Sequence, residues 1–217
     1  MTQSPLSRRA GMLSVTAAVL IILSQVMRLV VGRLLGPDSP ATSAHTVTYV
    51  LALLGMATLL LALTALYTRE SAALGRLGLI GYVTAFLGTL MVAGDWWFEA
   101  FVVPTIATAA PAVLDLPPSG SLLVGAIATL GLYTVGWTLF GLAALRARVF
   151  PQAAALLVIA GGLAGPLALS PPYQIPLAIA IGWIGLTLGS ESRRRHTAAT
   201  TRPEGNPRST RRAEVRP

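Results

Sequence analysis

The 217-residue chain contains no cysteine, which excludes disulfides, thiolate metal sites and a cysteine nucleophile. Lysine is also absent, so all 16 basic residues are arginine, a usage typical of high-GC bacterial genomes. Charged residues make up only 11% of the chain, whereas soluble domains carry about 25%. This charge is too sparse to cover a soluble globule, so apolar residues must face lipid.

The chain is instead rich in long apolar stretches, with 54% hydrophobic residues and a mean hydropathy of +0.70. Six of these stretches approach or exceed the length of about 20 residues that a helix needs to cross a bilayer. We therefore predict an all-α, polytopic membrane helix bundle of six transmembrane helices, formed by residues 1–189 as one domain. The predicted spans are residues 11–35, 44–67, 77–98, 121–145, 152–169 and 173–189.

The distribution of arginine predicts the orientation of this bundle. If the N-terminus is cytoplasmic, every arginine except Arg28 and Arg33 falls on the cytoplasmic side. That asymmetry follows the positive-inside rule, and an even number of spans returns the C-terminus to the same side. We expect a multi-pass protein of the bacterial plasma membrane with both termini cytoplasmic and the lipid bilayer as its main partner.

Two segments outside the spans have distinct compositions. Residues 99–118 contain four prolines and an apolar run too short for another span, so we predict a broken or interfacial helix at the outer surface. Residues 190–217 are rich in arginine, threonine and proline, which predicts a disordered cytoplasmic tail. This tail could bind anionic lipid or act only as a solvated topology anchor.

Ionisable residues near the outer ends of the spans are the main candidates for a site, because charges are costly within a bilayer. Asp95 and Glu99 are four residues apart and share a helix face if the helix continues between them. One interpretation pairs them with Arg28 or Arg33 as a structural lock between the first and third spans. The other makes the two carboxylates a cation or proton site tuned by Arg28.

Aromatic residues complete the predicted polar cluster, whose members are Arg28, Arg33, Asp95, Trp96, Trp97 and Glu99. We expect the two tryptophans at headgroup depth, where indole rings concentrate in membrane proteins. Pro104 follows shortly after and is a possible hinge. His45 starts the second span, where we expect it to cap the helix or face water, with a proton-relay role as the alternative.

No catalytic, cofactor-binding or metal-binding signature occurs in the sequence. His45 is the only histidine near a span, which excludes bis-histidine haem ligation within one chain. We predict no catalytic residue, no cofactor and no metal, and no nucleic-acid partner is expected.

Polar and small residues within the later spans predict helix contacts. We interpret Tyr133, Thr134, Trp137 and Thr138 as interhelical hydrogen-bond partners, or as hydroxyls satisfied by their own helix backbone, rather than as a substrate lining. Glycines four residues apart, at Gly161 and Gly165 and at Gly185 and Gly189, favour close packing within the chain or between copies of a homo-oligomer.

Two stretches resemble uncharacterised small six-span integral membrane proteins of high-GC bacteria, a family of unknown function. The first is GDWWFEAFVVP at residues 94–104, and the second is YTVGWTLFGLAALRARVFPQAAALLVIAGG at residues 133–162. The resemblance implies a helical membrane bundle. It supplies no substrate, cofactor or catalytic residue.

Three functional hypotheses follow from these observations. The first is a non-enzymatic structural or interaction protein, in which the polar cluster locks the bundle and residues 99–118 form a surface for a partner or lipid. The second is a small ion- or proton-coupled permease that uses Asp95 and Glu99. The third is a lipid-binding sensor or a membrane-embedded enzyme, supported only by the tryptophan-rich rim.

Overall fold

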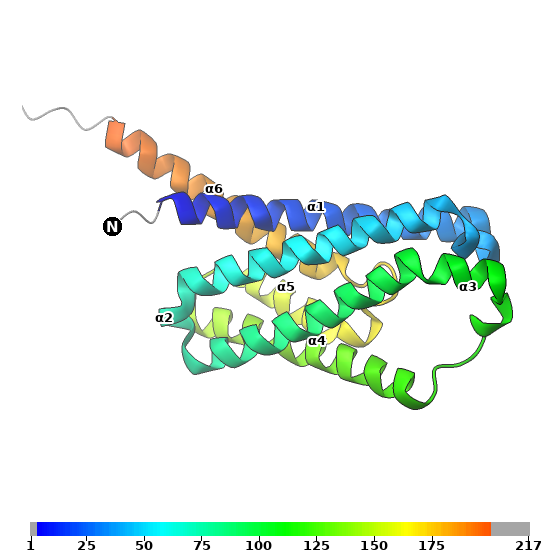
Figure 1. Ribbon diagram of the computed structural model, residues 1–217. Coiled ribbons are helices and arrows are strands. Elements are labelled where there is room, and N and C mark those ends of the chain that lie inside the picture. Colours follow the sequence, from blue (N-terminus) through cyan, green and yellow to red (C-terminus); the bar gives the residue numbers. More distant parts are fainter. Residues whose placement is uncertain (1–3, 201–217) are drawn as a thin grey trace, which may run out of the picture.

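The computed structural model describes residues 4–200, and this part of the chain is helical with no β-strand. The five long helices run along a common direction, joined by short helical turns (Figure 1). The α-helices are α1 (Ser4–Leu35), α2 (Ser43–Phe101), α3 (Val103–Ala109), α4 (Gly120–Ala147), α5 (Gln152–Leu163) and α6 (Ile175–Thr200). The 3₁₀-helices are η1 (Gly36–Ala41), η2 (Pro111–Val113) and η3 (Gly165–Leu167).

Helix α2 is not one straight rod, because it folds back on itself at Gly75. This glycine has φ +60° and ψ −156°, a backbone conformation that residues with a Cβ atom rarely adopt. The rings of Tyr67 and Tyr82 stack across the bend with centroids 4.3 Å apart. His45 and Glu99, 54 residues apart, touch, whereas a straight helix would separate them by about 81 Å. Residues 43–74 and 76–101 are therefore two antiparallel helical arms.

The long helices form a closed ring of contacts. Helix α1 packs between α2 and α6, α2 packs on α4, and α5 joins α4 to α6. Figure 1 shows α1 and α6 adjacent along much of their length, with α3 at the far right. We call the end that carries α3, η1 and the end of α1 the Arg28 end, and the end where α2 folds back the Gly75 end.

Small residues hold the helices close together. Gly81 and Gly88 of α2 lie against the backbone of α4, at Phe140 and Tyr133. Without a strong hydrophobic force between helices in lipid, such close contacts between small residues stabilise membrane bundles. Of the predicted glycine pairs, Gly161 faces α6 and Gly185 faces α1. These contacts lie within one chain.

Large apolar side chains cover much of the outer surface. Val19, Leu61, Val124 and Leu186 are each more than half exposed, although they lie on four different helices. Exposed apolar surface of this extent marks contact with lipid or with another protein. Three helical segments are also long and apolar enough to cross a membrane, at Arg8–Leu35, Ser43–Ala109 and Gly120–Ala147. The prediction of an all-helical membrane protein is confirmed by the helical structure of the described residues and by these three segments.

The helices extend further than the sequence indicated. Between the predicted second and third spans, the chain stays helical except at Gly75, and the hydroxyl groups of Thr68 and Ser71 are satisfied by carbonyls of their own helix. Residues 99–118 contain the end of α2, then α3 and η2, followed by a non-helical link to α4. The predicted disordered tail begins inside α6, whose backbone is helical through Thr200. The remainder of the tail lies outside the described residues.

Candidate functional site

A cavity of about 340 Å³ opens at the Arg28 end of the bundle. Its wall combines the last turns of α1 with η1, both arms of α2, the start of α3 and the link before α6. The polar side chains in this wall are those of Arg28, Ser39, His45, Thr48, Tyr49 and Glu99. We call this space the Arg28 cavity.

The Arg28 side chain joins four segments of the chain. Its guanidinium carbon lies 4.5 Å from the ring centroid of Trp96 and 5.1 Å from that of Tyr49. Its Nη2 donates a hydrogen bond to the backbone carbonyl of Leu169, just before α6. The other two guanidinium nitrogens are buried and have no hydrogen-bond partner among the described residues. Aromatic faces thus stabilise this cation by cation–π attraction, where an ion pair was expected.

His45 ties the two arms of α2 together at this same end. Its Nε2 lies 3.1 Å from the backbone oxygen and 3.3 Å from carboxylate Oε2 of Glu99. The His45 ring also packs on Tyr49 at 4.4 Å, and Tyr49 packs on Trp96 at 5.5 Å. The side chain of His45 is only 6% exposed, whereas that of Glu99 is 30% exposed. Glu99 therefore holds the histidine and still faces the cavity.

Two buried glutamines form a further link, between α1 and the segment that leads into α6. Nε2 of Gln25 donates a hydrogen bond to Oε1 of Gln174 at 2.9 Å. Both side chains are almost completely buried, and the remaining oxygen of Gln25 and nitrogen of Gln174 have no partner among the described residues. Gln25 lies one turn before Arg28, so both links leave α1 on the same face.

The predicted ion pair between Arg28 and either carboxylate is wrong. Glu99 pairs with His45, and Arg28 is occupied by two rings and a carbonyl. The carboxylate of Asp95 has no hydrogen bond or ion pair within the described part of the chain, although the charges of Arg28 and Glu99 act on it through space. Arg33 is exposed on α1 and is absent from the cavity wall.

The two neighbouring tryptophans have different environments. Trp96 is 1% exposed and lies in the cluster, whereas Trp97 is 52% exposed and packs on Phe101. Adjacent residues on a helix point about 100° apart, so only one could face the core. Trp97 faces outward with the apolar surface of α2.

Pro104 is the second residue of α3. Its ring has no backbone N–H to donate, and the short break between α2 and α3 falls at Val102. Val103, its neighbour, lines the Arg28 cavity. The possible hinge residue lies two positions after this one-residue break, where Val102 keeps right-handed helical dihedral angles and its N–H bonds to the carbonyl of Phe98. A hinge at Pro104 stays a prediction.

Sequence reasoning missed the roles of His45, Tyr49 and Gln25 in this cluster. His45 lies in the first turn of α2 and was expected to cap the helix or face water. Thr42 is the cap instead, because its Oγ1 accepts a hydrogen bond from the backbone N–H of His45, and the His45 ring is buried against Glu99. The signal for Gln25 was available, since it is an uncharged polar residue inside an apolar span. The contact between His45 and Glu99 depends on the α2 fold-back and has no local signal.

The middle of the bundle contains a separate polar contact. Trp137 donates its indole N–H to Oγ1 of Thr89 at 3.0 Å, which joins α4 to α2. The interpretation as an interhelical hydrogen-bond partner is confirmed for Trp137. It is wrong for Tyr133, Thr134 and Thr138, whose buried hydroxyl groups have no hydrogen-bond partner among the described residues. Among residues 4–200, no group of three or more His, Asp or Glu side chains is placed to hold a metal ion.

Comparison of this chain with protein-family models, with curated proteins and with solved structures found no match. The geometry of the cluster is therefore the basis for functional inference.

Proposed function

We propose that the chain is a six-span protein of the bacterial plasma membrane with both termini in the cytoplasm. The two arms of α2 supply the second and third crossings. Helix α5 has 12 residues and would span only about 18 Å, so its crossing includes η3 and the residues up to Leu169. The arginine distribution supports an outward-facing Arg28 end.

The function that we propose is that of a non-enzymatic interaction protein, whose Arg28 end is a rigid frame beneath the segment 99–118. The observation that carries this proposal is the convergence of three links at one end of the bundle: Arg28 with its rings and carbonyl, His45 with Glu99, and Gln25 with Gln174. Each link joins segments distant in sequence, so together they restrain the whole end.

The segment above this frame offers an apolar surface. Its exposed side chains include Phe101, Val113, Leu114 and Leu116, the last of which is 67% exposed. Leu114 also lines the Arg28 cavity. A fixed apolar segment suits contact with a second membrane protein, with another copy of this chain, or with lipid.

Hydrogen exchange of the backbone amides in residues 103–118 tests this function. Replacing Arg28 with Met removes the central cation, whereas Arg33→Met changes an exposed arginine of the same helix. We expect faster exchange in 103–118 for Arg28→Met alone, because the frame beneath the segment loosens. Equal exchange in the two variants would show that the cluster does not hold this segment.

A second function, that of a small cation- or proton-coupled permease, is favoured by the cavity itself. Glu99 supplies a partly exposed carboxylate to a space of about 340 Å³, which is at the lower end of ligand-site volumes. Asp95 is not part of this wall, so Glu99 is the carboxylate to test. Cation- or pH-dependent flux in proteoliposomes that is lost in Glu99→Gln would favour the permease over the frame.

A further inference from the structure

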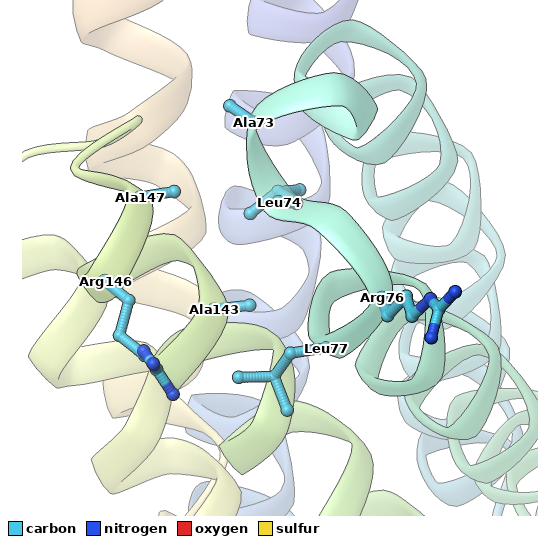
Figure 2. A pocket seen from close by; sticks show the side chains of 7 residues that line it. All are labelled: Ala73, Leu74, Arg76, Leu77, Ala143, Arg146 and Ala147. Atoms are coloured by element: carbon cyan, nitrogen blue, oxygen red, sulfur yellow. The ribbon is translucent and has the colours of Figure 1, made fainter.

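A second groove lies at the Gly75 end of the bundle, opposite the Arg28 cavity. It has a volume of about 340 Å³ and lies between the α2 fold-back and the last turns of α4. Arg76 comes from α2 and Arg146 from α4. Figure 2 shows the Arg146 side chain turned toward Leu77 and the Arg76 side chain turned outward. The rest of the wall is apolar: Ala73, Leu74, Ala143 and Ala147.

The two arginines give this groove a strong positive charge. Both side chains are exposed, and neither makes an ion pair within the described residues. No acidic side chain is part of the wall. An anion with several oxygen acceptors matches the guanidinium group of Arg146, which can donate several hydrogen bonds, and the charge of Arg76 at the edge adds to the attraction.

Next to each arginine, toward the middle of the bundle, exposed apolar side chains follow on the same helix. Ile80 lies one turn from Arg76 and is 56% exposed, and Val83 follows at 44%. Leu142 lies one turn from Arg146 and is 37% exposed. Residues three and four apart share a helix face, so exposed apolar side chains lie next to each arginine on the outer surface of α2 and α4.

From this arrangement we propose that the groove lined by Arg76, Leu77 and Arg146 is a binding site for an acidic phospholipid. The phosphodiester headgroup contacts Arg146, which is turned toward the groove, while Arg76 adds positive charge at the outer edge, and an acyl chain runs along the exposed apolar side chains of the same two helices. Charge favours a headgroup with net negative charge, such as phosphatidylglycerol, over zwitterionic phosphatidylcholine. The site belongs to the folded bundle and is distinct from the arginine-rich tail.

The experiment titrates each lipid into the purified full-length protein in a neutral detergent and follows the unfolding temperature. For the wild-type protein we expect phosphatidylglycerol to raise this temperature at concentrations where phosphatidylcholine does not. The double variant R76Q/R146Q should lower the apparent affinity for phosphatidylglycerol about thirtyfold. An unchanged affinity in this variant would overturn the proposal.

Three further arms separate the possible sources of the effect. The tail variant R193Q/R194Q/R195Q should keep the wild-type response; loss of the response there, with R76Q/R146Q unaffected, would assign binding to the tail. Inorganic phosphate should give no comparable shift, and an equal shift would identify a free-anion site. Ile80→Asn keeps both arginines and should still weaken the phosphatidylglycerol effect, because it removes acyl-chain contact. If R76Q/R146Q fails to fold, R76Q and R146Q alone should each weaken binding about fivefold.

Discussion

Replacing Gly81 with alanine should destabilise the bundle, because α2 and α4 approach each other too closely there to admit a side chain. A Cβ atom on Gly81 would lie 2.5 Å from the backbone nitrogen of Phe140 and 2.9 Å from its Cα. Ordinary contact begins at 3.4 Å, so the helices would have to part by 3.4 − 2.5 = 0.9 Å. The obstructing atoms belong to the backbone, and no rotamer change can relieve the clash.

The size of the effect follows from two opposing contributions. Overpacking of this kind costs about 1–3 kcal/mol, and alanine gains up to about 1 kcal/mol over glycine in helix propensity. Separation of the helices at Gly81 also disturbs the nearby contact of Gly88 with Tyr133. We therefore expect Gly81→Ala to lower the free energy of unfolding by about 1–2 kcal/mol.

Gly94→Ala is the matched control, since Gly94 lies on the same arm of α2 and a Cβ there would meet nothing within 4 Å. This variant should be as stable as the wild type or slightly more stable. Reversible unfolding in mixed detergent micelles, followed by circular dichroism, measures both variants against the wild type. If Gly81→Ala is as stable as Gly94→Ala, the close approach of α2 to α4 is refuted.

Three other predictions concern the amide pair, the fold-back and the surface. Gln25→Leu and Gln174→Leu should each lower the free energy of unfolding by about 1–3 kcal/mol, because each leaves the other buried amide unpaired. The double variant should recover most of this stability, whereas additive losses would contradict the pairing. Gly75→Ala should cost about 1–3 kcal/mol in the same unfolding assay, because alanine must adopt a positive φ; an unchanged stability would argue against this bend. Brominated lipid should quench less tryptophan fluorescence in Trp97→Phe than in the wild type, because Trp97 is exposed on the outer surface. Trp137→Phe should leave the quenched fraction intact, because Trp137 is buried. The reverse result would contradict the positions of the two rings.

The helical membrane architecture could be predicted from composition, because long apolar stretches have few alternatives to helices in lipid. The exact ends of the helices could not. The residues before Gly75 are polar enough to read as a connection, yet they are helical, with hydroxyl groups bonded to carbonyls of the same helix. Gly75 is the only non-helical residue within α2. Local sequence shows polarity, whereas the tight bend depends on one backbone conformation.

The candidate site was predicted in part. The cost of placing a charge in the bilayer drew attention to Arg28 and Glu99, and the aromatic pattern drew attention to Trp96. The structure brings these three residues to one end of the bundle. The partners of Arg28 and Glu99 differ from the predicted ones, because the sequence does not show which charged residues come together when a helix folds back. The α2 arms bring His45 to Glu99, and Arg28 is left to the ring faces.

This change of partners alters the physical account of the cluster. A buried ion pair would contribute little net stability, since desolvation of both charges offsets their attraction. Cation–π contacts need no second buried charge and contribute about 0.5–2 kcal/mol each. Arg28 carries the desolvation cost of one charge, including two buried nitrogens without a partner among the described residues, and its contacts with two rings and one carbonyl offset this cost without a carboxylate.

Thermal unfolding of Arg28→Met against Arg33→Met, both in lipid nanodiscs, tests this central claim most directly. The account predicts that Arg28→Met lowers stability by about 2 kcal/mol through the loss of its cation–π contacts and its bond to the Leu169 carbonyl. Arg33→Met, which changes an exposed arginine on the same helix, should unfold like the wild type. Equal unfolding of the two variants would contradict a structural role for Arg28.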